Sequence, residues 1–324
     1  MLRAVPATGS RQGAALNILY EGVLPEDRAV RVAESIREAE EGELDLRGLL
    51  LAELQEKPVG ALLLRMQPHG VAFLWPPVVS AKSAEVISWH TKSQPAITNE
   101  AIEDVLLQAA VLRLGELKAR IAQSLLVLNQ TREQLALSRN GFRRLTDLIF
   151  FEYSTVGSQS CNDRLANDVR TRLTHIIHRQ SRNRLRFAEV VEQTYRGSLD
   201  CPELNGIRTA SQALNVYAES GPVVRDLWRV YCDEHRDVGV ILVVDRPEQR
   251  TWEVIYLGVV ESARRCGVAR KMLTDVIKAA HDAHVDRVVI VADVRNRPAV
   301  LLYQSLGFAP FDERVAYVKF SERC

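Results

Sequence analysis

The most constraining feature of the sequence is a strand–helix–strand pattern in its last quarter. The segment TWEVIYLGVV (251–260) is rich in β-branched and aromatic residues, which is typical of a strand. Residues 268–284 place apolar side chains at helical spacing, and RVVIVADV (287–294) is a continuous apolar run, the pattern of a strand buried on both faces. Such a succession forms a crossover, so we expect the two strands to lie parallel in one sheet.

The turn between the first strand and the helix has a composition that suits phosphate. Three arginines surround the lone Gly267, namely Arg264, Arg265 and Arg270. Free backbone N–H groups at a helix N-terminus attract phosphate, and glycine lets a ligand come close. The dinucleotide fingerprint needs three glycines and the Walker loop needs Gly-Lys-Ser/Thr, so neither describes this turn. The remaining pattern is Arg-x-x-Gly-x-Ala, which ends at Ala269.

The neighbouring segments complete a mixed sheet. DLWRVYCDEH and the run 237–260 predict antiparallel strands, with DRPEQ as the turn between the last two. The segment 296–308 predicts a helix, because Pro298 suits a first helical turn and Gly307 suits a C-cap.

Together these motifs resemble the GCN5-related N-acetyltransferase (GNAT) superfamily. In that family Gln/Arg-x-x-Gly-x-Gly/Ala binds the pyrophosphate of acetyl-CoA. A second family signature matches, in order and spacing, Asn296, Ala299, Tyr303, Gly307 and Phe308. The resemblance covers about residues 165–324, and the segment 198–214 is similar to the substrate-side helical segment of some members.

The resemblance implies an acetyl-CoA site and no metal. Backbone atoms of Leu257 and Val259 would pair with the pantetheine arm and polarise the thioester carbonyl. The implied coenzyme-binding residues are Leu257, Gly258, Val259, Arg264, Arg265, Cys266, Gly267, Val268, Ala269, Arg270, Asn296 and Tyr303. We do not expect Cys266 to be a catalytic thiol, since no histidine is near it in sequence.

Two residues are candidates for proton transfer. By the resemblance, Tyr303 is the general acid that protonates the leaving thiolate; the alternative is a core aromatic residue. Glu253 is the candidate base for the acceptor amine, because period two places it on one face with Ile255, Leu257 and Val259. Alternatively, the carboxylate of Glu253 only reaches solvent, and a chain of water molecules serves as the base.

The first half of the chain repeats this order. Residues 49–79 predict three strands, and 101–122, 123–130, 131–142 and 145–153 predict helix, strand, helix and strand. LALSRNGF aligns with LLYQSLGF, and we expect Ser138 at the place of Tyr303. The region 80–100 has neither glycine nor arginine, and Pro76 and Pro77 remove two N–H donors, so this copy is expected to bind no coenzyme. An unrelated α/β domain is the alternative.

We therefore expect an α/β fold with a mixed α+β sheet: two GNAT-like domains in tandem, each a mostly antiparallel sheet with a central parallel βαβ crossover and flanking helices. The expected limits are 1–155 for the degenerate domain and 164–324 for the catalytic domain, with 152–163 as the linker.

Charge and composition bound the partners. The formal net charge is +1, which gives no global attraction to nucleic acid or membrane. The segment 164–186 holds seven arginines and one acid, but its alternation predicts the first strand of the domain and a solvated turn. Five widely spaced cysteines, no CxxC, no signal peptide and no long apolar run predict a cytoplasmic protein without metal.

These features predict an acetyl-CoA-dependent N-acetyltransferase that acts on a primary amine of a small molecule or peptide through its C-terminal domain. The alternative is a non-catalytic acyl-CoA-binding regulatory or scaffold protein. The chain is expected to be a monomer that forms an internal pseudo-dimer, or a homodimer.

Overall fold

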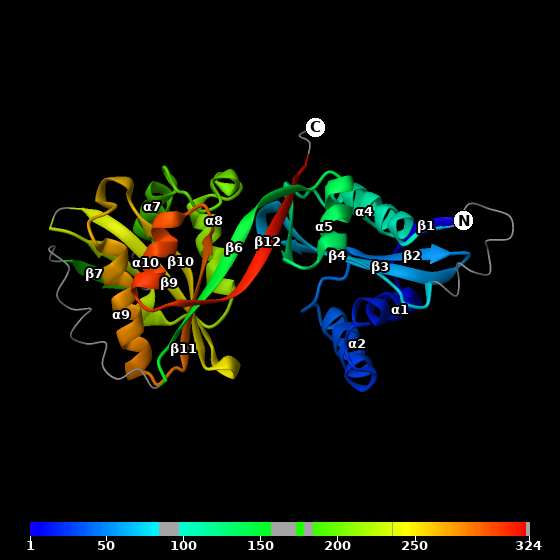
Figure 1. Cartoon of the computed structure of the whole chain (residues 1–324), viewed down its shortest axis with the longest axis horizontal. Helices are drawn as coiled ribbons and strands as arrows, with labels where there is room; N and C mark the ends of the chain where they lie inside the picture. Colours follow the sequence, from blue (N-terminus) through cyan, green and yellow to red (C-terminus); the bar gives the residue numbers. More distant parts are fainter. Residues whose placement is uncertain (84–96, 157–172, 178–183, 235, 322–324) are drawn as a thin grey trace. The chain divides into compact units, whose positions relative to one another are not determined.

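The computed structural model describes residues 1–83, 97–156, 173–177, 184–234 and 236–321. The chain divides into two compact units, Met1–Leu145 with Val315–Cys324, and Thr146–Arg314. Each unit combines helices with a sheet of parallel and antiparallel strands (Figure 1). In the described part of the chain, no helix has the length and apolar character that crossing a bilayer requires.

The first unit begins with β1 (Leu2–Pro6), α1 (Ser10–Leu19) and α2 (Pro25–Glu40). It continues with β2 (Leu49–Leu54), β3 (Lys57–Gln67), β4 (Val71–Val79), α4 (Asn99–Glu116), β5 (Ile121–Val127) and α5 (Thr131–Arg139), and β6 (Arg143–Ser154) starts in it. Strands β1 to β4 pair antiparallel in sequence order, and β4 pairs parallel with β5. The end of β12 follows β5 in this sheet.

The second unit holds β7 (Thr174–Ile177), α7 (Arg184–Tyr195), α8 (Ala210–Glu219), β8 (Arg229–Cys232), β9 (Asp237–Arg246) and β10 (Thr251–Val259). Then come α9 (Val268–Asp282), β11 (Arg287–Asp293), α10 (Arg297–Ser305) and the start of β12 (Ala309–Phe320). The strand order is β6-β11-β10-β9-β8-β7, and only β10 and β11 pair parallel among the strand pairs described there. The predicted crossover is confirmed.

Within the described residues, the two halves repeat one order of elements: a strand, two helices, three strands, a helix, a strand, a helix and a strand. This confirms the predicted tandem fold. The prediction that Ser138 corresponds to Tyr303 in the first half was wrong, however. The N–H of Phe142 bonds the carbonyl of Leu137, as the N–H of Phe308 bonds that of Tyr303. Leu137 therefore stands at the place of Tyr303, and the neighbouring Ser138 is exposed.

The halves also exchange their last strands. Most of β6 pairs with β11, and its Phe151 and Tyr153 lie in the hydrophobic core of the second unit. Val315 and Tyr317 of β12 lie in the core of the first unit. The compact units thus differ from the predicted limits 1–155 and 164–324 at these two strands. Alternation along a strand shows that it is half-buried but not which sheet it joins.

The crossover helix packs as its sequence pattern predicts. The six apolar residues at helical spacing in α9 are all buried, namely Val268, Met272, Leu273, Val276, Ile277 and Ala280. Burying this stripe against the sheet fixes where α9 begins, and so fixes the turn that precedes it. Of the arginine-rich segment, Thr174–Ile177 forms the expected strand, while 164–172 and 178–183 lie outside the described residues.

Candidate functional site

The parallel strands β10 and β11 pair over only part of their length. Residues Thr251–Val254 pair with Arg287–Ile290, although β10 extends to Val259 and β11 to Asp293. The β9–β10 register shifts between Val254 and Tyr256, which marks a β-bulge. Beyond the bulge, one backbone edge of β10 is therefore not used by β11.

Backbone alternation identifies the residues of β10 whose N–H and C=O groups point to that free edge. The N–H of Val260 bonds the carbonyl of Val238 on β9. Neighbouring strand residues direct their backbone groups to opposite sides, so Leu257 and Val259 point away from β9. The carbonyl of Val259 accepts a hydrogen bond from Arg264 at 3.2 Å. The backbone of Leu257 and the N–H of Val259 thus face the side from which β11 has separated, where the sequence predicted pantetheine binding.

Gly258 has a packing role at the same place. A Cβ atom there would lie 2.6 Å from Oγ1 of Thr194 on α7. Glycine is required because any side chain would push α7 away from β10.

The N-terminus of α9 follows the predicted pattern of a phosphate cradle. Gly267 is its N-cap residue at φ 81°, and no side chain caps the helix. The first N–H groups of a helix have no partner within the helix, so those near Gly267 are available to an anion. A Cβ at Gly267 would meet no atom within 4 Å, so the approach is open. Cys266 is exposed beside it.

The first unit lacks this arrangement. The helix α4 is capped by Thr98, whose Oγ1 accepts from the N–H of Ala101 at 3.2 Å. A side chain therefore occupies the place where an anion would bind. The preceding residues 84–96, which lack glycine and arginine, lie outside the described residues.

The three arginines of the turn differ in their contacts. The Arg264 guanidinium donates to the carbonyls of Thr194, Arg196 and Gly197 at the end of α7. Arg270 donates to Oγ of Ser305 at 2.8 Å. Among the described residues, no hydrogen bond or ion pair engages the side chain of the exposed Arg265. Arg264 thus braces α7 and the loop after it, and Arg265 has the side chain best placed to meet a phosphate.

Asn296 precedes the first turn of α10, and Tyr303 lies on the buried side of the same helix. Asn296 caps the helix by accepting from the N–H of Ala299 at 3.4 Å. Tyr303 is 4% exposed, and its ring meets Phe151 edge-on at 5.7 Å. Burial, and then the charge of Asp200, raises the pKa of Tyr303. No hydrogen bond between described residues engages its hydroxyl, which leaves that group available to a ligand.

Glu253 has an environment other than the expected one. Its carboxylate accepts from Nε and Nη2 of Arg246 at 2.9 and 2.7 Å, and its side chain is about one-third exposed. It pairs with Val244, whereas Leu257 pairs with Ile241. Residues 241 and 244 point to opposite faces, so the expectation that Glu253 shares a face with Leu257 was wrong. The bulge, which the sequence did not reveal, reverses the alternation.

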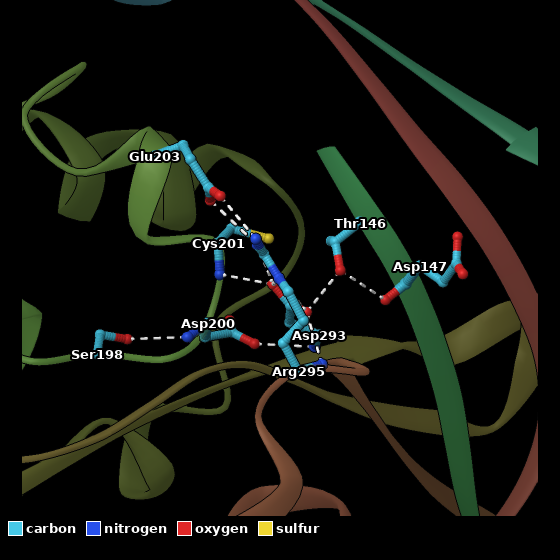
Figure 2. A network of polar contacts seen from close by, with 8 residues as sticks. All are labelled: Thr146, Asp147, Ser198, Asp200, Cys201, Glu203, Asp293 and Arg295. Carbon is cyan, nitrogen blue, oxygen red and sulfur yellow. Dashed lines mark hydrogen bonds and ion pairs between the residues drawn. The ribbon is translucent and has the colours of Figure 1, made fainter. Parts of the chain in front are cut away.

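A polar network closes the end of β11 (Figure 2). The carboxylate of Asp293 is 0% exposed and accepts from Oγ1 of Thr146 at 2.6 Å, the N–H of Cys201 at 3.1 Å and Nη2 of Arg295 at 2.7 Å. Burial alone would raise the pKa of Asp293, but hydrogen bonds led by those of Arg295 and Thr146 lower it to about 2. Arg295 also pairs with Glu203. The network fixes the loop between α7 and α8 against β11.

That loop presents Asp200. Its Oδ1 accepts from the N–H of Asp293 at 2.9 Å, and the nearby side chain of Asn296 acts to lower its pKa. Asp200 as a whole residue is exposed to solvent. Its carboxyl group is nevertheless surrounded by protein atoms that reduce its hydration, and this raises its pKa. The charge of Asp200 also raises the pKa of Tyr303.

Three partly exposed tyrosines from α7, α8 and β10 form a cluster, and the charge of Asp200 raises the pKa of two of them, Tyr217 and Tyr256. The Tyr256 ring on β10 lies 5.6 Å from that of Tyr217 on α8 and 6.3 Å from that of Tyr195 on α7. The hydroxyls of Tyr256 and Thr194 lie 2.6 Å apart. Burial raises the pKa of Tyr217 to about 12; the charge of Arg208 opposes this rise and that of Asp200 adds to it. Sequence reasoning missed Asp200 and this tyrosine cluster; the one available signal was the similarity of 198–214 to a substrate-side segment.

Comparison with known proteins identifies the fold. Residues 208–308 match the family model described as the acetyltransferase (GNAT) family. No curated protein matches the sequence significantly. The structure is similar to that of a GCN5-related N-acetyltransferase from Sphaerobacter thermophilus, with 14% identity, a TM-score of 0.60, and coverage of 100% of this chain and 96% of that chain.

Two further solved structures are similar over most of this chain. A GCN5-related N-acetyltransferase from Kribbella flavida has 13% identity and a TM-score of 0.50, covering 99% of this chain and 72% of that chain. A GCN5-related glucosamine N-acetyltransferase region of a fungal multi-domain GH3 β-N-acetylglucosaminidase has 12% identity and a TM-score of 0.60. The match covers 98% of this chain and 38% of that chain. At these identities the likeness concerns the fold, which both halves of the chain share.

Proposed function

Because residues 208–308 match the model of the GNAT acetyltransferase family, we propose that the second unit transfers an acetyl group from acetyl-CoA to a primary amine. One observation carries this proposal. The free backbone edge of β10 leads directly to an uncapped helix N-terminus at Gly267. A thioester with a pantetheine arm and a pyrophosphate is a ligand that needs both features, in that order along the chain.

The residues of the second unit divide the work of binding. Backbone N–H groups of residues 265–270 would hold the pyrophosphate, with Arg265 adding charge. Leu257 and Val259 would hold the pantetheine arm by backbone hydrogen bonds. Arg264 would act indirectly, since it orders the end of α7. The first unit would bind no coenzyme, because Thr98 caps α4 and Pro76 and Pro77 lack N–H groups.

Tyr303 is the proposed general acid. Its ring is fixed by Phe151 and Phe308, and its hydroxyl has no partner among the described residues. The raised pKa keeps the hydroxyl protonated, as a proton donor requires. Glu253 remains a candidate base, but its ion pair with Arg246 would have to open before it could accept a proton.

The rival function is binding of an acyl-CoA without turnover, for regulation or as a scaffold. The free hydroxyl of Tyr303 favours the enzyme, because a binding protein needs no proton donor there. We also propose that the protein acts in the cytoplasm, as its cysteine usage suggests.

Substitution of Tyr303 by phenylalanine tests the proposal. The turnover number should fall by about 10²-fold, the low end for a general acid, because a thiolate is a fairly good leaving group. The KM for acetyl-CoA should change little, since the lost interaction belongs to the transition state. Tyr317→Phe, at an equally buried tyrosine in the core of the first unit, is the matched control. Unchanged turnover in Tyr303→Phe would assign this residue to packing alone.

A further inference from the structure

We propose that Asp200 is the general base that deprotonates the acceptor, and that Tyr195, Tyr217 and Tyr256 bind an acceptor whose amine is carried on an aromatic or other flat apolar body. This inference rests on the proposed acetyl transfer. It names the acceptor class and a catalytic residue on the loop between α7 and α8, which no sequence motif marks.

The position of Asp200 is fixed from several sides. The N–H of Asp293 bonds its carboxylate at 2.9 Å, and the N–H of the next residue, Cys201, bonds Asp293 at 3.1 Å. Arg295 links Asp293 to Glu203 in the same loop. The start of the loop is held by Arg264, through the carbonyls of Arg196 and Gly197. A base held in this way needs no rearrangement before it accepts a proton.

Asp200 also lies between the elements that would carry the thioester. Asp293 ends β11 and Asn296 begins α10, so both mark the part of the sheet where β10 and β11 no longer pair. Tyr256 belongs to the separated part of β10, and Tyr303 follows on α10. An acceptor nitrogen at Asp200 would therefore lie on the route between the free edge of β10 and the proton donor.

The tyrosine cluster fits the rest of the acceptor. Its three rings come from α7, α8 and β10, and each is partly exposed, so a ligand can reach them. Aromatic faces attract both flat apolar groups and ammonium ions. The charge of Asp200 acts on Tyr217 and Tyr256, whereas the guanidinium of Arg208 acts on Tyr195 and Tyr217. A cationic head is therefore favoured on the Asp200 side of the cluster and its apolar body among the rings. This combination selects an amine on an aromatic body over a plain alkyl amine.

The electrostatic surroundings make Asp200 a stronger base than an ordinary aspartate. The raised pKa of Asp200 makes it a better proton acceptor than an ordinary aspartate. The titratable and charged groups that act on Asp200 come from its own loop, from β10, from the end of β11 and the residues after it, and from α8 and α10. They are Cys201, Tyr256, Asp293, Arg295, Tyr217 and Tyr303.

The proton balance closes with these two residues. Asp200 takes one proton from the ammonium, and the freed lone pair forms the C–N bond as the C–S bond breaks with its electrons on sulfur. Tyr303 gives its hydroxyl proton to that sulfur and regains one from the nitrogen, which must lose a second proton. Asp200 then releases its proton to solvent. The products are the acetamide, the free thiol and one proton.

The first experiment compares the full-length wild type with Asp200→Asn, using 2-phenylethylamine and acetyl-CoA across pH 5–9. Asparagine keeps an oxygen that can accept from the N–H of Asp293, so the loop should hold. We expect kcat/KM to fall by roughly 10²- to 10⁴-fold and the acidic limb of the pH profile to disappear. The Kd of acetyl-CoA should stay within about twofold. Glu219→Gln, at an exposed residue ending α8, is the control and should behave as wild type.

A second variant tests the acceptor class. Tyr217→Leu removes one wall of the cluster, and the KM for 2-phenylethylamine should rise about two- to tenfold, since one aromatic contact contributes about 0.5–1.5 kcal/mol. The KM for butylamine should change less than twofold. If the wild type turns over and the Asp200→Asn variant keeps the same rate and pH profile, Asp200 is not the general base. Equal effects of Tyr217→Leu on both amines would refute the acceptor class. A wild type that acetylates butylamine but not 2-phenylethylamine would refute the acceptor class and leave the proposed function standing. A wild type that binds acetyl-CoA but acetylates neither these amines nor a broader amine panel would refute the proposed function together with this inference.

Discussion

Substitution of Phe151 by alanine tests the strand exchange between the two halves of the chain. Phe151 is encoded by the first half, but it is 0% exposed in the core of the second unit and meets the ring of Tyr303 at 5.7 Å. Truncating a fully buried phenylalanine costs about 3–5 kcal/mol. That range includes the loss of an edge-to-face ring contact of about 0.5–1.5 kcal/mol.

Urea unfolding followed by tryptophan fluorescence gives a direct measurement. Trp228 and Trp252 are buried in the core of the second unit and report on it. With a slope of about 2 kcal/mol per molar urea, a loss of about 4 kcal/mol lowers the midpoint of that unit by about 2 M. Phe150→Ala is the matched control, because the neighbouring Phe150 is only partly buried. Its midpoint should fall by less than half as much.

The refuting results are definite. Equal midpoint shifts for Phe151→Ala and Phe150→Ala would show that β6 does not complete the core of the second unit. A fragment of residues 164–324 should fail to unfold cooperatively, because it lacks the strand that pairs with β11 from Arg287 to Asp293. Cooperative unfolding of that fragment, with acetyl-CoA bound as tightly as by the full chain, would contradict the reasoning in the same way.

Three further predictions concern the cradle and the polar network. Gly267→Glu should abolish acetyl-CoA binding measured by calorimetry, because a carboxylate repels phosphate; Gly267→Ala, which adds only strain at φ 81°, should weaken binding far less, and equal losses would remove charge as the cause. The full chain should bind one acetyl-CoA, since Thr98 already caps α4, and a measured stoichiometry of two would contradict the degenerate first copy. Asp293 has its pKa lowered from 3.8 to about 2, so its contribution of roughly 2 kcal/mol is present above pH 4 and is lost as the pH falls toward 2. Asp293→Asn should lack that contribution at pH 7 and flatten the acid-induced loss of stability, whereas superimposable stability curves for wild type and variant would show that the network around Asp293 contributes nothing.

Local patterns in the sequence determined the elements of the second unit and the place of the cradle. The spacing of apolar residues predicted β10, α9 and β11, and the lone Gly267 between them predicted the uncapped helix start. Such features depend on residues within a few positions of one another, so the chain order alone reveals them. Tyr303 was found in the same way, through a signature confined to one strand and one helix.

Only the tertiary structure decided the surroundings of these residues. The bulge after Val254 moved Glu253 to the opposite face from Leu257, and the pairing with Arg246 came from the neighbouring strand. Asp200 is held by the N–H of Asp293, which lies 93 residues away in sequence. Contacts of this kind depend on which segments the sheet brings together, and hydrophobic alternation carries no record of that choice. The same physical reason explains why the exchange of β6 and β12 between the two units could not be read from the order of the elements.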